Sequence, residues 1–468
     1  MTLVFRNWSL SLRCDRHDSI QKCDIACTGV YIGVGTDIID GTVRSITMPK
    51  SFGMLFPHRY GKEKPCTKTC GIDFWLAAKF LKAIGEPPLR LVLWDGKDIA
   101  SPSSPPAVTM VIRDRSALWR LFTNPLLNFG DDYSSGRIEI EGGLVTFMET
   151  VYRSMARTPR FRRISDPSAY QRNQPQLNSL SGSQQNIHHH YDIGNQFYQL
   201  WLDAEMLYTC AYFPDPAATL EDAQIAKMDL VCRKLRLQAG QTVVEAGCGW
   251  GSLARYMARH YGVKVRAYNI SRDQIAYARE RAGAEGLTGQ IEYVEDDYRN
   301  ITGTYDVFVS VGMLEHVGPD HYKELGGVIN RSLKEQGLGL IHTIGQNIAA
   351  PMSPWFLKRI FPGSYPPTLR EIMDVFEPWD FTVLDVENLR LHYAKTCEHW
   401  LERFEQNRDR VREMFDESFV RAWRLYLSGC ISNFSLGRLQ LFQVVFSRST
   451  NNLVPLTRSC LAAPRAGS

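Results

Sequence analysis

A short apolar run that ends in closely spaced glycines constrains the fold of this chain more than any other segment. Residues 242–245 have the pattern of a strand, and residues 243–251 read Val-Val-Glu-Ala-Gly-Cys-Gly-Trp-Gly before a helical pattern begins. A glycine-rich turn between a strand and a helix lets the backbone approach a ligand closely where the first strand of an α/β sheet ends. The segment therefore predicts a ligand site at that edge of the sheet.

Strand-like and helical patterns alternate along the chain after residue 187. The predicted strands are 242–245, 263–269, 291–295, 305–311, 339–343, 381–384 and 439–446. The clearest helical patterns between them are 252–260, 272–284 and 320–333. Such alternation predicts an α/β fold with a doubly wound, mostly parallel sheet that has helices on both faces. A long helical region at 397–427 separates the last two strands, which are expected to cap one edge of the sheet.

The rest of the chain divides into segments of different pattern. Residues 71–152 predict a small α+β domain, with helices at 74–81 and 116–122 and strands at 89–94, 108–112 and 137–142. The full expected division is an irregular, poorly ordered leader at 1–70, this small domain, a basic and polar linker at 153–183, the α/β domain at 184–447 and a tail at 448–468. The linker is either a solvated flexible segment or, through its arginines, a contact for anionic lipid headgroups.

The composition excludes several classes of protein. The chain has 468 residues, of which 44% are hydrophobic and 22% are charged, and its formal net charge is +4. These values are typical of a globular protein and give no reason to expect binding to nucleic acid. No stretch approaches the ~20 continuous apolar residues that span a bilayer, and the first residues contain no apolar run of signal-peptide length. The odd number of cysteines, 11, favours reduced thiols in a cytoplasmic protein.

Two Cys-x-x-x-Cys pairs, Cys23 with Cys27 and Cys66 with Cys70, raise the question of a metal site. Their spacing fits structural zinc only loosely, and the segment between them has little strand or helix pattern. The consecutive histidines at 188–190 cannot easily converge on one ion. We therefore predict no metal.

The glycine spacing separates two classes of nucleotide-binding domain. It reads E-x-G-x-G-x-G rather than G-x-G-x-x-G, and the second strand ends in a neutral Asn269 where an NAD site needs an Asp or Glu. This loop resembles the cofactor loop of class I methyltransferases, although an NAD domain or a turn without a ligand stays an alternative. The resemblance implies S-adenosylmethionine as cofactor. The residues that it places around the cofactor are Tyr208, Thr209, Glu245, Gly247, Cys248, Gly249, Trp250, Gly251, Asn269, Ser271, Gln274, Asp297 and Tyr298.

Five further blocks, in the same order, resemble the cyclopropane fatty acid synthase family, which includes the mycolic acid cyclopropane synthases. They are 187–198 with 207–213, 312–318, 340–345, 392–396 and 419–446. The small domain resembles the N-terminal module of longer bacterial members, which implies a role in engaging the bilayer or in pairing subunits as a homodimer. Residues 351–369 resemble the apolar segment that lines the family's lipid channel.

The resemblance implies a reaction on membrane lipids. S-adenosylmethionine would give a methylene group to a cis double bond of a phospholipid acyl chain, at the inner face of the membrane, through a carbocation. Such a reaction needs a dry pocket, aromatic faces and a base beside the new methyl. In the family that base is a bound bicarbonate ion. Its binders, carried over to this chain, are Cys210, Glu315, His342, Tyr393 and the backbone of Ile344.

Several alternatives stay open at this stage. His342, Cys210 and Tyr393 could each be ordinary core residues. A related fatty-acyl methyltransferase would give methyl-branched or methylene products without closing a ring. A non-catalytic lipid-binding relative would need no intact anion site, and neither would a methyltransferase that acts on small amines or phenols.

Overall fold

The computed structural model describes residues 68–100, 105–158, 193–454 and 456–458, which all belong to one compact unit. Several predictions concern other residues and lie outside the described part. These are the leader before residue 68, most of the linker, the histidines at 188–190, and the cysteine pairs except Cys70. Among the described residues, no helix has the length and apolar character needed to cross a membrane.

The described part of the small α+β domain contains four helices and four strands. In chain order they are α1 (Gly71–Ala83), β1 (Leu89–Val92), β2 (Asp98–Ala100), β3 (Val108–Ile112), α2 (Arg115–Thr123), α3 (Pro125–Ser134), β4 (Ile138–Glu141) and α4 (Leu144–Ala156). The strands form one sheet in the order β2-β1-β3-β4, in which β1 and β3 are parallel and the other neighbours antiparallel. Val108, Met110 and Ile112 alternate along β3 and point into the core of this domain.

The sequence does not predict β2, α3 or α4. β2 has only three residues, too few to show an alternating pattern. α3 begins at Pro125 because the side chain of Asn124 caps it, accepting the N–H of Leu127 at 3.4 Å. α4 continues to Ala156, so it passes the boundary expected at residue 152.

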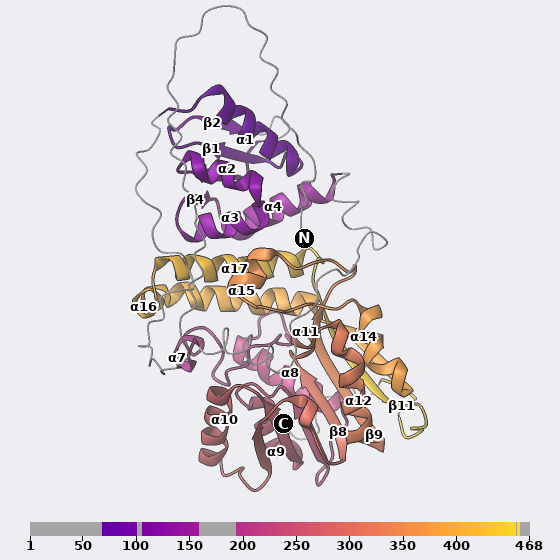
Figure 1. Ribbon diagram of the computed structural model, residues 1–468. Coiled ribbons are helices and arrows are strands. Elements are labelled where there is room, and N and C mark those ends of the chain that lie inside the picture. Colours follow the sequence, from indigo (N-terminus) through magenta and orange to yellow (C-terminus); the bar gives the residue numbers. More distant parts are fainter. Residues whose placement is uncertain (1–67, 101–104, 159–192, 455, 459–468) are drawn as a thin grey trace, which may run out of the picture. The chain divides into compact units, whose positions relative to one another are not determined.

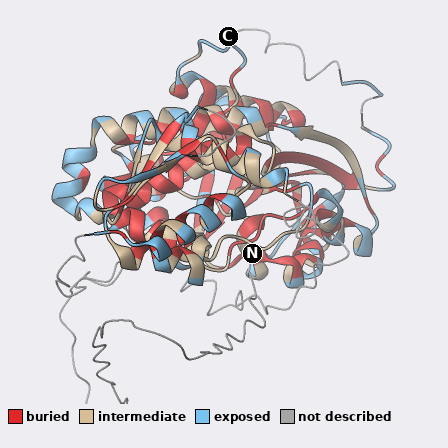
Figure 2. Cartoon of the chain, turned by 90° about the horizontal axis from the view of Figure 1, so that it is seen from above, coloured by how far each residue is buried: buried red, intermediate tan, exposed pale blue. Residues whose placement is uncertain are grey.

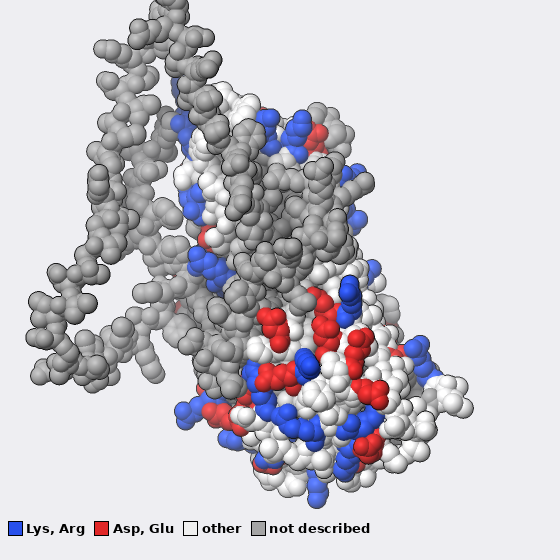
Figure 3. Space-filling model, turned by 45° about the vertical axis from the view of Figure 1, so that its right-hand side comes forward, with Lys and Arg blue, Asp and Glu red and all other residues white. Residues whose placement is uncertain are grey.

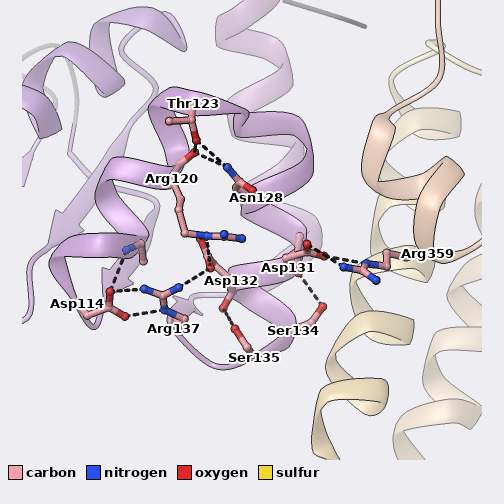
Figure 4. A network of polar contacts seen from close by, with 12 residues as sticks. Asp114, Arg120, Thr123, Asn128, Asp131, Asp132, Ser134, Ser135, Arg137 and Arg359 are labelled. Atoms are coloured by element: carbon pink, nitrogen blue, oxygen red, sulfur yellow. Dashed lines mark hydrogen bonds and ion pairs between the residues drawn. The ribbon is translucent and has the colours of Figure 1, made fainter. Parts of the chain in front are cut away.

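Arginine–aspartate pairs connect α2 and α3 to the segment before β4 (Figure 4). Arg137 lies 2.5 Å from an oxygen of Asp114 and 3.3 Å from an oxygen of Asp132. The Nε of Arg120 donates to Asp132 at 3.0 Å. The two guanidinium groups therefore compensate the charge of Asp132, a carboxylate that is buried in this domain.

Helices and strands alternate through the large domain. In chain order they are α7 (Asn195–Tyr198), α8 (Leu220–Lys234), β5 (Thr242–Ala246), α9 (Ser252–Tyr261), β6 (Lys264–Asn269), α10 (Arg272–Ala284), β7 (Ile291–Glu295), η2 (Tyr298–Asn300), β8 (Tyr305–Val311), α11 (Leu314–Val317), η3 (Pro319–His321), α12 (Tyr322–Ser332), β9 (Leu333–Gly345), α13 (Pro354–Arg359), α14 (Leu369–Phe376), η4 (Glu377–Trp379), β10 (Phe381–Asn388), α15 (Arg390–Gln406), α16 (Arg408–Met414), α17 (Glu417–Ser435) and β11 (Gln440–Arg448).

The large sheet has the strand order β10-β11-β9-β8-β5-β6-β7. The neighbours from β9 to β7 are parallel, whereas β11 is antiparallel to β9 and β10 is antiparallel to β11. The predicted parallel sheet, with its last two strands at one edge, is therefore confirmed. The prediction for 339–343 was too short, because β9 begins at Leu333 and its exposed, polar residues 334–336 hide the strand pattern.

Two hydrophobic clusters cover the two faces of this sheet. Successive residues of a strand point to opposite faces, so Val243 belongs to one cluster and Val244 to the other. Figure 2 shows buried residues along the strands and exposed residues mainly on the outer turns of the helices. The fold is thus an α/β sheet with a core on each side.

The helical region predicted at 397–427 consists of three helices and is longer than predicted, because α15 begins at Arg390 and α17 ends at Ser435. α15 and α17 run side by side, with the short α16 between them in the sequence (Figure 1). Asp416 begins α17 because its side chain accepts the N–H of Phe419 at 2.7 Å. These helices cover the site described below.

The small domain contacts α17 and α13. The Nε of Arg421, on α17, donates to the carbonyl of Tyr133 at 2.6 Å, and its Nη2 donates to the carbonyl of Ile138 at 3.0 Å. Arg359, at the end of α13, forms a forked pair with Asp131 of α3, with both distances 3.1 Å (Figure 4). These contacts fix α13 against α3.

The described surface on the side shown in Figure 3 carries acidic and basic side chains intermixed. Ion pairs of the described surface include Arg259 with Glu285 at 2.6 Å and Arg266 with Glu292 at 3.0 Å. Exposed pairs of this kind contribute little to stability, but they divide the surface charge into small patches.

Candidate active site

Glu315 lies at the carboxyl end of the central strands. β8 ends at Val311, and the chain turns through Gly312 into α11, which carries Glu315. β9 extends beyond the end of β8, and there the N–H of Ile344 donates to Oε1 of Glu315 at 2.6 Å. Burial raises the pKa of Glu315 to about 7, although this hydrogen bond acts in the opposite direction. The carboxyl group therefore changes protonation near neutral pH.

The contact changes the part expected of Ile344. The family resemblance gave its N–H to a bound anion, but in the structure this N–H is directed at the carboxylate of Glu315. Ile344 therefore positions Glu315. The sequence could not indicate this, because the contact joins a strand to a helix 29 residues earlier in the chain.

His342 points to the same side of β9 as Ile344, because the two are separated by one residue in a strand. Its Nδ1 lies 3.1 Å from Nε2 of Gln443 on β11. Burial lowers the pKa of His342 well below its usual range, and the cations Lys227 and Lys234 lower it further. The imidazole is therefore neutral at neutral pH.

Two buried polar atoms at this place have no hydrogen-bond partner among the described residues. They are Nε2 of His342 and Oε2 of Glu315. Leaving a buried donor or acceptor without a partner is costly, so such atoms commonly face a ligand or an ordered water. Each of these two atoms is therefore a candidate contact for a ligand or an ordered water.

Cys210 and Tyr393 come from segments that are held together at α15. Cys210 is fully buried, and the next residue, Ala211, donates its N–H to Oγ1 of Thr396 at 3.0 Å. Tyr393 lies one turn earlier in the same helix, and burial, with the nearby Cys210 and Glu315 among the further causes, raises the pKa of its hydroxyl well above the usual value. The structure thus brings Cys210, Glu315, Tyr393 and, through β9, His342 into one region.

Aromatic side chains pack beside this region. The hydroxyl groups of Tyr208 and Tyr426 are 2.8 Å apart. The ring of Tyr208 lies 5.3 Å from that of Trp400 and 6.3 Å from that of Phe361, measured between centroids. Trp400 also lies 5.9 Å from the ring of Tyr393. The site therefore has apolar, electron-rich surroundings.

The glycine loop connects β5 to α9. The N–H groups of Gly247 and Cys248 donate to the carbonyl of Tyr268 at 2.9 and 3.0 Å, which folds the loop over the end of β6. Gly251 has a φ of +80°, and a Cβ there would lie 2.5 Å from a tyrosine hydroxyl of β7. Gly249 has a φ of +53°, but a Cβ there would meet nothing within 4 Å. Open space therefore lies beside the backbone at Gly249, where a ligand can approach.

Two ionisable residues are buried near this loop. Near the end of β5, Oε2 of Glu245 has no partner among the described residues, and burial raises the pKa of this carboxyl group to about 8. Lys227 of α8 donates from Nζ to Oγ1 of Thr209 at 2.8 Å, and burial lowers the pKa of this lysine to about 8. Trp250 donates from its indole to Asn195 at 2.8 Å. Thr209 and Trp250, both expected near the cofactor, are thus held by protein groups.

The polar residues expected at the adenosine side bond mainly to one another. Nδ2 of Asn269 donates to Oε1 of Gln274 at 2.7 Å and to the carbonyl of Gly249 at 3.3 Å. The side chain of Ser271 caps α10 by accepting the N–H of Gln274 at 3.4 Å. These contacts tie the end of β6 to the glycine loop.

Asp297 and Tyr298 follow β7, as the sequence indicates. Asp297 accepts the N–H of Arg299 at 2.9 Å and pairs with its guanidinium group at 3.0 Å. Tyr298 is buried beside it. Both residues lie in the turn after the third parallel strand, where open α/β sheets place ligands.

Comparison with known proteins decides the family. A family model described as mycolic acid cyclopropane synthetase matches residues 178–444, which is more than half of the chain. The chain belongs to this family. A second model, described as a domain of unknown function, matches residues 76–159.

Relatives in this family include enzymes of fatty acid and phospholipid modification. A Pseudomonas putida protein described as a probable fatty acid methyltransferase is 35% identical over 76% of this chain and 91% of its own length. The cyclopropane-fatty-acyl-phospholipid synthase of Escherichia coli strain K12 is 41% identical over 58% of this chain and 69% of its own. The crystal structure of mycolic acid cyclopropane synthase CmaA1 with SAH and CTAB covers 57% of this chain and 98% of its own, with a TM-score of 0.54 and 29% identity.

The chain is therefore an S-adenosylmethionine-dependent methyltransferase with the class I fold. Its residues fit that cofactor on two observations. The backbone at Gly249 adjoins open space, and Oε2 of Glu245 is a buried acceptor without a partner among the described residues. A hydroxyl or ammonium group of a bound cofactor could donate to this oxygen.

Sequence reasoning missed three polar residues of this cyclopropane synthetase homologue. Lys227 was detectable, because it lies on the buried face of α8 one turn from the apolar Ala223 and Val231. Gln443 was also detectable as an amide inside the apolar strand β11. Lys234 gave no signal, since a lysine in the last turn of a helix is ordinary.

Proposed function

We propose that this protein is a cyclopropane-fatty-acyl-phospholipid synthase, which adds a methylene group across a cis double bond of a phospholipid acyl chain with bound bicarbonate as the base. The observation that carries the proposal is the pair of buried, unpartnered atoms among the described residues, Oε2 of Glu315 and Nε2 of His342, beside an aromatic cluster. An unpartnered carboxylate oxygen and an unpartnered ring nitrogen, on residues joined through β9, suit an ion that has both an O–H and negatively charged oxygens.

The chain's own residues would bind this anion and fix the direction of its O–H group. Oε2 of Glu315 accepts the O–H of bicarbonate, while Nε2 of His342 and the hydroxyl of Tyr393 donate to its oxygens. Cys210, which is fully buried, would line the same position. Ile344 keeps Glu315 in place through its N–H. A bicarbonate ion held by these residues would supply the base for the proton that the transferred methyl group loses as the ring closes.

The surroundings of the site suit a cationic hydrocarbon. S-adenosylmethionine supplies a methyl group on a sulfonium centre, and the alkene electron pair forms the new C–C bond as the S–C bond breaks. The positive charge left on the neighbouring carbon needs aromatic faces and the exclusion of water. Tyr208, Trp400 and Phe361 provide such faces, and the N–H of Tyr365 ties the segment that contains Phe361 to the carbonyl of Glu315 at 2.8 Å.

A second candidate is methyl transfer without ring closure. It is favoured by the Pseudomonas putida relative, described as a probable fatty acid methyltransferase, which matches this chain over 91% of its own length. The two reactions share the first step and differ in which proton the cation then loses. Loss from the transferred methyl group closes the ring, whereas loss from a chain carbon beside the cation gives a methyl-branched alkene. The position of the base therefore decides between them.

The small domain is proposed to bring the enzyme to the cytoplasmic face of the membrane, or to pair subunits. Ile72 and Trp75 of α1 are 62% and 58% exposed, and Trp119 of α2 is 48% exposed. Nζ of Lys79 lies 5.5 Å from the ring centroid of Trp75. Exposed tryptophan beside lysine suits the interface of an anionic bilayer.

Expression in a bacterium that lacks cyclopropane lipids tests the proposal. Fatty acid methyl esters from these cells would be analysed by mass spectrometry. Ring-containing esters heavier by one CH₂ are the expected result. Methyl-branched or methylene esters would favour the second candidate, and no new ester despite intact cofactor binding would overturn both. With purified enzyme, removal of dissolved bicarbonate should slow turnover, and its return should restore it.

A further inference from the structure

Lys234 fixes the orientation of the Gln443 side chain. Nζ of Lys234 lies 2.7 Å from Oε1 of Gln443 and 2.5 Å from Oε2 of Glu387. An ammonium group has hydrogen-bond donors and no acceptor, so the atom of the amide that faces it must be the carbonyl oxygen. The reverse orientation would place the amide NH₂ against the ammonium group.

The fixed amide in turn fixes the tautomer of His342. Nε2 of Gln443 is a donor and lies 3.1 Å from Nδ1 of His342, so Nδ1 must be the acceptor. A neutral imidazole with a bare Nδ1 carries its proton on Nε2. Nε2 of His342 is the buried atom that has no partner among the described residues. It is therefore an N–H donor directed away from β11.

The same chain of contacts opposes a second proton on His342. Protonated Nδ1 would face the NH₂ group of Gln443, and Lys227 and Lys234 add positive charge nearby. The nearest negative charge in the chain of contacts, Glu387, lies beyond Lys234 and is paired with it. Lys234, Gln443 and His342 are all buried, so water cannot easily replace these partners.

We propose that Lys234 and Gln443 are positioning residues that hold His342 as the neutral Nε2–H tautomer, so that His342 donates a hydrogen bond and does not act as the base. The identity of the acceptor, bicarbonate, rests on the proposed function, whereas the tautomer does not. Neither ring nitrogen can then take the proton of the transferred methyl, since Nε2 already carries one and Nδ1 is occupied. A separate base is required.

Nitrogen-15 NMR of protein labelled at histidine tests the tautomer directly. The spectrum of His342→Gln identifies the signals of His342. We expect the Nε2–H tautomer in the wild type, unchanged between about pH 6 and 8. Gln443→Glu replaces the donor by an acceptor of the same shape, so Nδ1 of His342 should become protonated. Lys234→Met should give a mixture, because the amide of Gln443 can then rotate.

Activity provides the second measurement. Gln443→Glu should lower kcat about 10- to 100-fold, the usual loss when an outer partner of a site is removed, and leave S-adenosylmethionine affinity unchanged. Gln440→Glu is the matched control, because Gln440 is a buried amide of the same strand that bonds to Asn388 and Gly437 instead. This control variant should keep the tautomer and the rate.

Two results would overturn the inference. One is an Nδ1–H tautomer in the wild type, and the other is a Gln443→Glu variant that folds and keeps both the tautomer and kcat. Failure of the proposed function looks different, since the wild type would then make no cyclopropane lipid while the tautomer and its response to Gln443→Glu stay as expected.

Discussion

Oε1 of Glu315 accepts the backbone N–H of Ile344 at 2.6 Å, which leaves Oε2 as the oxygen that faces the proposed anion. Glu315→Gln can keep the first contact, because its Oε1 still accepts from Ile344. Its NH₂ group cannot accept the O–H of bicarbonate. We expect turnover to fall by about 10²- to 10⁴-fold, the range for loss of a group that organises proton transfer. Calorimetric S-adenosylmethionine affinity should be nearly unchanged, and a parallel loss of both would place Glu315 in the cofactor site instead.

Stability should depend on pH through the same carboxyl group. Burial raises its pKa from 4.5 to about 7, so between these values the folded protein keeps a proton that the unfolded chain loses. The contribution of Glu315 to the free energy of unfolding is therefore highest below pH 4.5 and falls as pH rises to about 7, by roughly 3 kcal/mol. Glu315→Gln lacks this dependence. The Tm of the wild type minus the Tm of this variant should be larger at about pH 5 than at about pH 8. An equal Tm difference at both pH values would contradict the burial of the carboxylate.

Gly249→Ala tests the cofactor position. Gly249 has a φ of +53° and open space where a Cβ would lie, and Gly240 has a φ of +83° and open space as well. Alanine at either position should cost about 1–2 kcal/mol of stability from the left-handed backbone. Only Gly249→Ala should weaken S-adenosylmethionine binding, measured by calorimetry, because its methyl group enters the space beside the loop. Equal S-adenosylmethionine affinities in the two variants would show that the cofactor does not bind beside Gly249.

Gly130→Ala tests the contact between the small domain and α13. A Cβ at Gly130 would overlap the indole ring of Trp355, whereas a Cβ at Gly71, also in a helix of this domain, would meet nothing within 4 Å. We expect Gly130→Ala to displace α13 and to speed hydrogen exchange at 354–359, with Gly71→Ala as the control. Because α13 leads into Phe361 beside Tyr208, the KM for lipid vesicles should also rise. Unchanged exchange at α13 would show that Trp355 adapts without moving the helix.

Much of the large sheet was predictable because its strands and helices have strong periodic patterns. The seven predicted strands all exist, and 291–295 and 305–311 have the predicted limits. Prediction failed where the local pattern is weak, as in the very short β2 and the polar start of β9. It also failed where a single side chain caps a helix, as Asn124 does for α3 and Asp416 for α17. Their limits depend on local hydrogen bonds rather than on hydrophobic period.

The sequence by itself determined the α/β class, the glycine loop and the kinds of side chain that the chemistry needs, because these depend on residue type and spacing along the chain. Only the tertiary structure decided which atoms meet. β11 lies beside β9, with Gln440 paired to Gly345, although the two strands are far apart along the chain. That placement puts Gln443 against His342. β8 ends before β9 does, so Ile344 of β9 does not pair with β8. Its N–H donates a hydrogen bond to Glu315 instead. Strand order and strand ends are set by the packing of the whole sheet, which no local pattern encodes.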